Sequence, residues 1–265
     1  MNKIPIFDSV VHPTINGDWI LPNYPQYGNI NTLLNEMEAN TICNAFAVGM
    51  NSIGAYDETK YSEFVTSKSD KLLPIAFFNV NDHNDISSVI TKLKFLKSKK
   101  YKGIKLHPRI GKFNLLNPLL PEIIKAANDE HLVVLLCTYF YENTENVLYN
   151  NLENLFKLLI NIPNEKIILL HASSVRLLEM MEITRAFKNI LLDLSFTLNK
   201  YENSSLDMDI QCLFNSFDRR ICVGSDFPEI SISEMRQRFD FFSKNISAEK
   251  ASNIAHKNIQ QFLNF

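Results

Sequence analysis

The 265-residue sequence has little glycine and no long apolar run, and it carries no excess of basic charge. Seven glycines disfavour a mechanism built on Gly-rich phosphate-binding loops. No stretch approaches the roughly 20 apolar residues that a membrane-spanning helix needs. Lysine and arginine number 27 against 29 aspartate and glutamate, so nothing favours binding to a phosphate backbone. We therefore expect a small-molecule substrate, with neither nucleic acid nor membrane as a partner.

The cysteines and the first residues point to a reducing compartment. Four cysteines are scattered along the chain without a Cys-x-x-Cys pair, which is typical of free thiols: Cys43, Cys137, Cys212 and Cys222. The N-terminus lacks the apolar stretch of a signal peptide. Hydrophobic residues at 46% and charged residues at 21% are ordinary for a globular protein. We expect a cytoplasmic protein.

Short apolar runs alternate along the chain with segments of helical periodicity. The runs are bounded by polar or turn-forming residues, which predicts buried strands. Helices are predicted at 86–96 and 152–159, where apolar residues recur at helical spacing, and at 118–129, which prolines open. The eight predicted strands lie within Ile4–Pro13, Thr41–Met50, Leu72–Val80, Tyr101–Pro108, His131–Tyr139, Lys166–Ser173, Asn189–Phe196 and Arg220–Pro228.

Eight strands alternating with helices predict an α/β fold, specifically a single (β/α)₈ TIM barrel over residues 1–265. Dividing the chain by eight gives about 33 residues per unit, the size of one βα repeat. An open doubly wound sheet is the rival, but it usually has fewer strands and often a Gly-rich first turn, which this chain lacks. The aromatic first connection, 14–29, could fold over the barrel mouth as a lid.

Polar residues gather at the ends of the predicted strands, where a barrel of this kind places its chemistry. His12 ends the first strand, Lys105, His107 and Arg109 end the fourth, and His171 ends the sixth. Cys137 ends the fifth strand, and Asp226 follows the eighth. Three of the six histidines fall at such ends, which favours a functional site there.

These motifs resemble those of the amidohydrolase superfamily, in its amidohydrolase-related branch of metal-dependent hydrolases, decarboxylases and lactonases. Phe-Asp-Ser-Val-Val-His-Pro is similar to the opening Asp-x-His-x-His strand of that branch. Gly-Ile-Lys-Leu-His-Pro resembles its fourth strand, Leu-Leu-His-Ala its sixth, and Gly-Ser-Asp-Phe-Pro its eighth. Residues 251–263 resemble its closing helix. The resemblance covers nearly the whole chain in the right order.

The sequence departs from the family at two metal ligands. The family's first strand supplies two ligands at i and i+2, and here these positions are Val10 and His12. The strand-five histidine ligand falls at Cys137. The resemblance therefore implies a reduced metal set of His12 and Asp226, with Cys137 as a possible third ligand because a thiolate binds zinc well. We expect either no cofactor or a weakly bound divalent metal, zinc if one is present.

The resemblance implies an enzyme, a hydrolase of a small carboxylate-bearing carbonyl compound such as a lactone, ester or amide. Asp226 would activate water, with His171 and His12 as proton donors or oxyanion stabilisers. Lys105 and His107 would line the substrate pocket. Lys105, with Arg109 as the weaker candidate, would bind the substrate carboxylate. Two alternatives remain open: a non-catalytic barrel that binds a small molecule, and a decarboxylase of the same branch.

Asp226, rather than Cys137, is expected to carry the chemistry. Partial burial at the barrel mouth would raise the pKa of Asp226 and make its carboxylate a better base. Burial in an apolar run would raise the pKa of the Cys137 thiol and leave it inert.

Overall fold

The structure, a computed structural model, describes residues 3–20, 27–141 and 151–263. Within them, eight parallel strands form one sheet in the order of the chain. Each strand lies inside its predicted apolar run, so all eight are confirmed. The strands are β1 (Ile6–Val11), β2 (Ile42–Val48), β3 (Leu72–Phe78), β4 (Gly103–Leu106), β5 (Val133–Cys137), β6 (Ile167–Leu170), β7 (Ile190–Asp193) and β8 (Ile221–Cys222).

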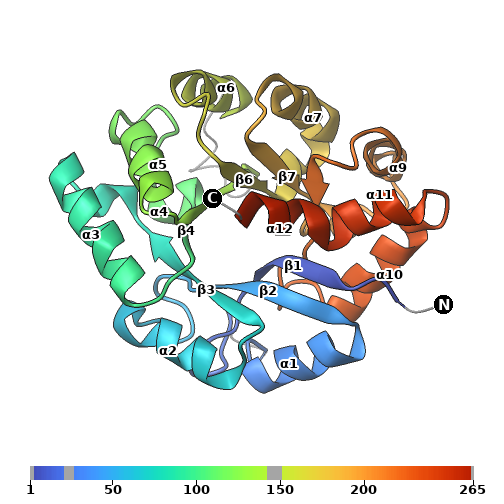
Figure 1. Cartoon of the computed structure of the whole chain (residues 1–265), viewed down its shortest axis with the longest axis horizontal. Helices are drawn as coiled ribbons and strands as arrows, with labels where there is room; N and C mark the ends of the chain where they lie inside the picture. The colour runs from blue at the N-terminus through green and yellow to red at the C-terminus, as the bar shows by residue number, and fades with distance from the viewer. Residues whose placement is uncertain (1–2, 21–26, 142–150, 264–265) are drawn as a thin grey trace.

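The two ends of the sheet meet through backbone hydrogen bonds. Ser9 N donates to the carbonyl of Val223 at 3.1 Å, and the N–H of Asp226 donates to the carbonyl of Val10 at 3.0 Å. His12 N then donates to the segment beyond β8 at 2.7 Å. The strands thus form a nearly closed ring with helices around it (Figure 1), and the predicted single (β/α)₈ barrel is confirmed.

Helices connect the strands and cover the outside of the ring. The predicted helices over 86–96, 118–129 and 152–159 correspond to α3, α5 and α6. Asp85 caps α3 by accepting a hydrogen bond from the N–H of Ser88. The α-helices are α1 (Ile30–Ala39), α2 (Glu58–Lys68), α3 (Ile86–Ser98), α4 (Pro108–Gly111), α5 (Leu119–Asp129), α6 (Asn151–Asn161), α7 (Leu177–Ala186), α8 (Thr197–Lys200), α9 (Leu206–Ser216), α10 (Ile232–Ser243), α11 (Ala248–Ser252) and α12 (Asn258–Leu263). Short 3₁₀ segments are η1 (Val80–Asp82) and η3 (His171–Arg176), and η4 (Asn253–Lys257) is a π-helical turn.

Two apolar clusters stabilise the barrel, one between strands and helices and one inside the ring. In β4, Ile104 and Leu106 belong to the outer cluster, so Lys105 between them points inward. Val10 is inside with Phe7, three residues earlier, because the register of β1 shifts between Asp8 and Val11. Burying each such apolar side chain contributes roughly 1.5–3 kcal/mol.

The last helix covers the end of the barrel where the strands begin. Ile259 of α12 packs into the inner cluster, and Asn258 Nδ2 donates to the carbonyl of Ile221 at 2.7 Å. In Figure 1 this helix lies across the near end of the ring. The opposite end, where the strands finish, is left to the connecting segments that build the site.

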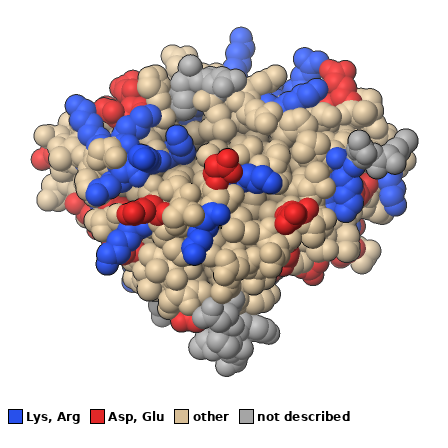
Figure 2. All heavy atoms as spheres, turned by 60° about the horizontal axis from the view of Figure 1, so that its bottom comes forward, with Lys and Arg blue, Asp and Glu red and all other residues tan. Residues whose placement is uncertain are grey.

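The surface mixes charges of both signs. On the face drawn in Figure 2, lysine and arginine side chains are interspersed with aspartate and glutamate, and uncharged residues cover most of it. In the described part of the chain, no helix combines the length and apolar character needed to cross a membrane.

Candidate active site

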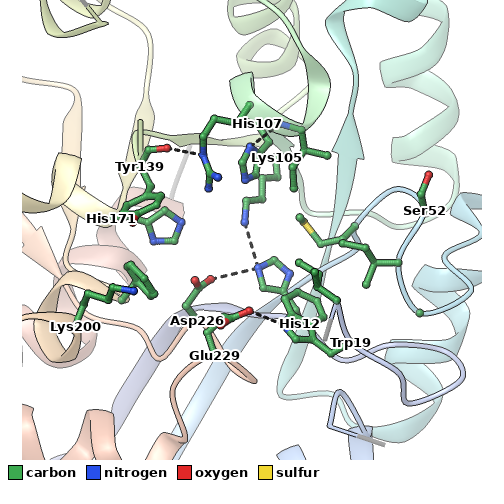
Figure 3. Close-up of a pocket in the computed structure, with 17 residues that line it drawn as sticks. His12, Trp19, Ser52, Lys105, His107, Tyr139, His171, Lys200, Asp226 and Glu229 are labelled. Atoms are coloured by element: carbon green, nitrogen blue, oxygen red, sulfur yellow. Dashed lines mark hydrogen bonds and ion pairs between the residues drawn. The ribbon is translucent and has the colours of Figure 1, made fainter. Parts of the chain in front are cut away.

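A pocket of about 650 Å³ lies where the strands finish. All six residues expected to act in catalysis or substrate binding line it: His12, Lys105, His107, Arg109, His171 and Asp226. The side chains of the five that Figure 3 labels, all but Arg109, converge on one space there. The remaining wall comes mainly from aromatic and aliphatic groups, namely Trp19, Ile20, Met50, Ile53, Ile110, Tyr139 and Phe196, with Ser52, Gly54, Lys200 and Glu229.

The imidazole of His12 is fixed between a backbone carbonyl and the amine of Lys105. Its Nδ1 lies 2.9 Å from the carbonyl oxygen of Val48, which can only accept, so Nδ1 carries the hydrogen. Its Nε2 is then free to accept from Lys105 Nζ at 3.1 Å (Figure 3). Burial and the nearby ammonium lower the pKa of His12 to about 4. His12 is therefore neutral at neutral pH.

The carboxylate of Asp226 faces the same imidazole. Oδ1 lies 3.3 Å from His12 Nε2, but a neutral His12 has no hydrogen there, and among the described residues this buried oxygen has no hydrogen-bond donor. Burial raises the pKa of Asp226, but the positive charges of His171 and Lys105 outweigh it and hold the pKa below the usual range. The expectation of a raised pKa for Asp226 is therefore wrong, because cationic neighbours outweigh burial.

The segment that carries His171 has an unusual backbone. The four residues of His171–Ser174 have φ of 66°, 46°, 49° and 57°, although none is glycine. Such conformations cost free energy and persist only where the surroundings enforce them. Ser173 N donates to Thr138 Oγ1 at 3.0 Å, and Thr197 Oγ1 donates to the carbonyl of His171 at 2.5 Å. The segments that follow β5 and β7 thus hold the backbone that carries His171 at the pocket wall.

A buried carboxylate supports His171 through a serine. Ser195 Oγ lies 3.0 Å from His171 Nδ1 and donates to Asp193. The N–H of His171 also donates to Asp193 Oδ2 at 3.1 Å. Burial alone would lower the pKa of His171, but Asp226 and Cys137 raise it above its usual value. The protonated form is therefore favoured, with Nδ1 directed to Ser195.

A second carboxylate, Asp8, lies under the site. Asp8 accepts hydrogen bonds from the backbone N–H of Ser225 at 2.9 Å and from its hydroxyl at 2.6 Å. Burial nevertheless raises its pKa to about 7. Ser9, the next residue, donates to Asp193, whose own pKa burial also raises. β1 and β7, which lie on either side of β8, therefore each contribute a buried carboxyl group.

The sequence analysis missed Asp193 and Ser195. Both lie near the end of the seventh predicted strand, in Leu-Leu-Asp-Leu-Ser-Phe, where they are the polar residues of an apolar run. Their spacing of two puts their side chains on one face of the strand. That pattern was the available signal, because each residue type is also common in an ordinary turn.

Cys137 lies at the end of β5, fully buried, between two pocket histidines. Its sulfur interacts with the imidazoles of His107 and His171. Burial raises the pKa of the thiol, but these imidazoles outweigh it and lower the pKa well below the usual value. The expectation of a raised thiol pKa is wrong. Cys137 is not among the described residues that line the pocket, so its sulfur can act on the site only through the two histidines.

The donor set does not fit the divalent metal that the family pattern implies. Among the described residues, no group of three or more histidine, cysteine, aspartate or glutamate side chains is placed to hold a metal ion. Val10 supplies no donor, and the Lys105 amine takes the lone pair of His12 Nε2. Two unit charges about 4 Å apart repel by about 4 kcal/mol in a protein surface environment, so the ammonium opposes a cation there.

Two cations stand at the pocket rim. Arg109 Nε donates to the carbonyl of Tyr139 at 2.8 Å, and its guanidinium lies 5.0 Å from the centre of that ring. Lys200 Nζ lies 4.8 Å from the centre of the Phe196 ring. Both residues line the pocket, so two positively charged side chains contribute to its wall.

The described part of the first connection forms one wall. Trp19 stacks on the imidazole of His12 with ring centres 5.2 Å apart, and its indole N–H donates to Glu229 Oε1 at 2.6 Å. The contact joins the segment after β1 to the segment after β8 at the pocket wall, and a lid over 14–29 stays a prediction. Residues 21–26 lie outside the described residues.

Comparison with known proteins gives one family match. The family model described as Amidohydrolase matches residues 61–265, more than half of the chain. No curated protein matches the sequence.

Solved structures share the fold at low identity. A TIM-barrel protein from Bordetella bronchiseptica is 16% identical over 98% of each chain, with a TM-score of 0.81. A 5-carboxyvanillate decarboxylase from Sphingomonas paucimobilis is 12% identical over 98% of this chain and 99% of its own, with a TM-score of 0.72. A dihydroorotase from Campylobacter jejuni is 16% identical over 98% and 83%, with a TM-score of 0.67. At these identities the likeness shows the fold alone.

Proposed function

Because this chain belongs to the amidohydrolase family, we propose that it hydrolyses a small carboxylate-bearing carbonyl compound, a lactone, ester or amide, without a metal-bound water. One observation carries this proposal. The carboxylate of Asp226 is ionised and lines the pocket alongside protonated His171, and its Oδ1 has no hydrogen-bond donor among the described residues. An acceptor and a proton donor on one cavity are what acyl transfer to water requires.

In the proposed reaction, water donates a hydrogen bond to the Asp226 carboxylate and its oxygen attacks the substrate carbonyl. The new C–O bond forms as the water proton passes to Asp226, and the carbonyl oxygen gains negative charge. His171 donates its proton to that oxygen or to the leaving group as the bond to the leaving group breaks. Proton loss from His171 removes a cation that holds the pKa of Asp226 low, so Asp226 becomes more basic as the reaction proceeds.

The role of His12 in this proposal differs from the proton donation expected from the sequence. Its hydrogen is on Nδ1 and is donated to Val48, so Nε2 has no proton to give to substrate. The expected proton donation by His12 is therefore not supported, and His171 takes that role alone. His12 instead holds the amine of Lys105 in the pocket.

The charges of the pocket favour an anionic substrate. Lys105, Arg109 and Lys200 contribute cationic side chains, against the carboxylates of Asp226 and Glu229. Guanidinium and ammonium groups at the rim attract a carboxylate and orient the molecule that bears it. A cavity of about 650 Å³ suits a small molecule. The mixed surface charge in Figure 2 offers no matching footprint for a nucleic acid on that face.

A substrate panel tests the proposal. Lactones, esters and amides, each with and without a carboxylate, are incubated with the wild-type protein, with Asp226→Asn, and with Asp129→Asn as a control at an exposed position. We expect turnover of a carboxylate-bearing member, a fall of about a hundredfold or more in Asp226→Asn, and no change in the control. Aromatic carboxylates with detection of released CO₂ test the decarboxylase alternative. CO₂ release without hydrolysis, or binding without turnover, would contradict the proposal.

A further inference from the structure

Lys105 places its ammonium against the imidazole of His12, a residue at a metal-ligand position of the family pattern. From this geometry we infer that the Lys105 ammonium replaces the divalent cation at this site and stabilises the negative charge that develops on the substrate carbonyl oxygen. The inference rests on the proposed hydrolysis for its chemical role. The placement of the cation itself does not depend on any substrate.

The contacts of Lys105 support this assignment. Its side chain rises from β4 inside the ring and is only 2% exposed, yet it lines the pocket. Burial lowers the pKa of the Lys105 amine, and the negative charge of Asp226 opposes that shift and favours the ammonium. Nζ lies 3.1 Å from His12 Nε2, and the same imidazole nitrogen lies 3.3 Å from Asp226 Oδ1. His12 and Asp226 are the two metal-ligand types that the chain retains, and the ammonium lies against the first of them. Figure 3 shows Nζ directed into the space between His12, His107 and His171.

The ammonium has hydrogens to spare for a substrate. An ammonium carries three N–H donors, and among the described residues one hydrogen bond from Nζ is found, to His12. The remaining donors can face a carbonyl oxygen in the pocket. A fixed cation in a site shielded from water stabilises a developing oxyanion without reorganising, and no proton leaves the nitrogen in this role. The water proton still goes to Asp226.

The change at Val10 agrees with this arrangement. A divalent ion needs several donors, whereas an ammonium attached to the chain needs only an acceptor and room. Val10 lies in the inner apolar cluster and contributes none. Neutral His12 has its free lone pair aimed at Nζ because its other nitrogen is committed to Val48. These residues therefore supply the acceptor that the Lys105 ammonium needs, but too few donors for a metal ion.

Zinc titration tests the placement without any substrate. Zinc is titrated calorimetrically into the folded wild-type protein, Lys105→Ala, the double variant His12→Ala/Lys105→Ala, and Lys102→Ala, an exposed lysine three residues away. Removing the ammonium frees His12 Nε2 and removes its repulsion, so we expect Lys105→Ala to bind zinc about tenfold more tightly or better. Lys102→Ala should match the wild type, and the double variant should lose the gain. Equal zinc affinity in wild type and Lys105→Ala, or stoichiometric zinc in the wild type, overturns the inference.

Kinetics test the role of the cation. Lys105→Met keeps the length of the side chain without its charge, and thermal unfolding reports whether it folds. On a hydrolysed panel compound we expect kcat to fall about a hundredfold with KM little changed, the scale of losing one oxyanion donor. Ethylamine should partly restore the kcat of Lys105→Ala. A rise in KM with kcat unchanged would show that Lys105 binds the substrate carboxylate instead, and would overturn the inferred role.

The zinc titration and the kinetic assay together distinguish failure of this inference from failure of the proposed function. If no panel compound is hydrolysed but Lys105→Ala gains zinc affinity, the hydrolase proposal fails and the cation placement stands. If a compound is hydrolysed and zinc affinity does not respond to Lys105→Ala, the placement fails while the hydrolase proposal stands.

Discussion

Asp193 reaches His171 twice, once through the backbone and once through the ring. Its Oδ2 accepts the main-chain N–H of His171 at 3.1 Å, and Ser195 Oγ connects the same carboxylate to Nδ1 of the imidazole. The backbone hydrogen bond fixes the position of the His171 main chain, and the serine hydroxyl fixes the orientation of the imidazole ring. Together they hold the other imidazole nitrogen toward the pocket, where the proposed proton transfer takes place.

Removal of the serine hydroxyl should misorient this imidazole. In Ser195→Ala we expect kcat to fall about tenfold or more, because a proton donor contributes only when it is within reach of the reacting oxygen. The free energy of unfolding should fall by about 1 kcal/mol for the lost hydrogen bonds. Activity on a hydrolysed panel compound and chemical denaturation measure the two effects.

The same region offers a matched control. Ser174 is buried near His171, but its hydroxyl has no hydrogen-bond partner among the described residues. Ser174→Ala should therefore leave kcat and the free energy of unfolding nearly unchanged. Equal losses in the two variants would contradict the specific contribution of Ser195.

The barrel and most of the site could be predicted because strand ends are visible in the sequence. Each apolar run fixes where a strand finishes, and a polar residue at that point enters the mouth of the barrel. His12, Lys105, His107, His171 and Asp226 were found in this way and do line one pocket. The family resemblance added which of them to group together.

Ionisation could not be predicted in the same way. The pKa of Asp226 depends on cations from β4 and from the end of β6, and that of Cys137 depends on two imidazoles. Burial is visible in an apolar run, but the neighbours across the ring are not. The hydrogen bond between Lys105 and His12 joins residues 93 positions apart. Only the fold therefore shows that the Lys105 amine occupies the lone pair of His12 Nε2.

Chelation should not affect turnover. After dialysis of the wild-type protein against a strong chelator, we expect unchanged kcat/KM on a hydrolysed panel compound, because the described donors do not form a metal site. Elemental analysis before and after dialysis should find substoichiometric zinc. A loss of activity that added zinc restores would contradict this prediction and would promote Cys137 to a ligand.

Substitution of Cys137 should move the pH dependence more than the rate. The thiolate raises the pKa of His171, so Cys137→Ser should lower that pKa. Since the protonated imidazole is the proposed donor, the alkaline limb of the kcat/KM profile should shift to lower pH, while most of the maximal turnover remains. Profiles of wild type and variant measure the shift. Abolished turnover in Cys137→Ser, with Asp226→Asn still active, would instead favour a thiolate nucleophile.

Asp8 should make stability depend on pH in a definite direction. Its pKa is about 7 in the folded protein and about 3.8 as the ordinary value, so between these limits the folded state retains a proton that the unfolded state releases. The contribution of Asp8 to the free energy of unfolding therefore falls as pH rises from about 4 to about 7, by on the order of 4 kcal/mol.

A comparison with Asp8→Asn isolates that contribution. His12, whose pKa is lowered to about 4, contributes in the opposite sense, because its stabilising share is lost as pH falls from about 6.5 to about 4. The total slope thus mixes the two groups, whereas the difference between wild type and variant reports Asp8. Asparagine stays neutral and keeps an oxygen for the backbone N–H of Ser225, so Asp8→Asn should gain stability relative to wild type as pH rises. Denaturant titrations at about pH 5, 6, 7 and 8, which bracket the folded pKa of Asp8, measure the unfolding free energy of both proteins. If the difference between variant and wild type is the same at every pH, Asp8 ionises normally in the folded protein.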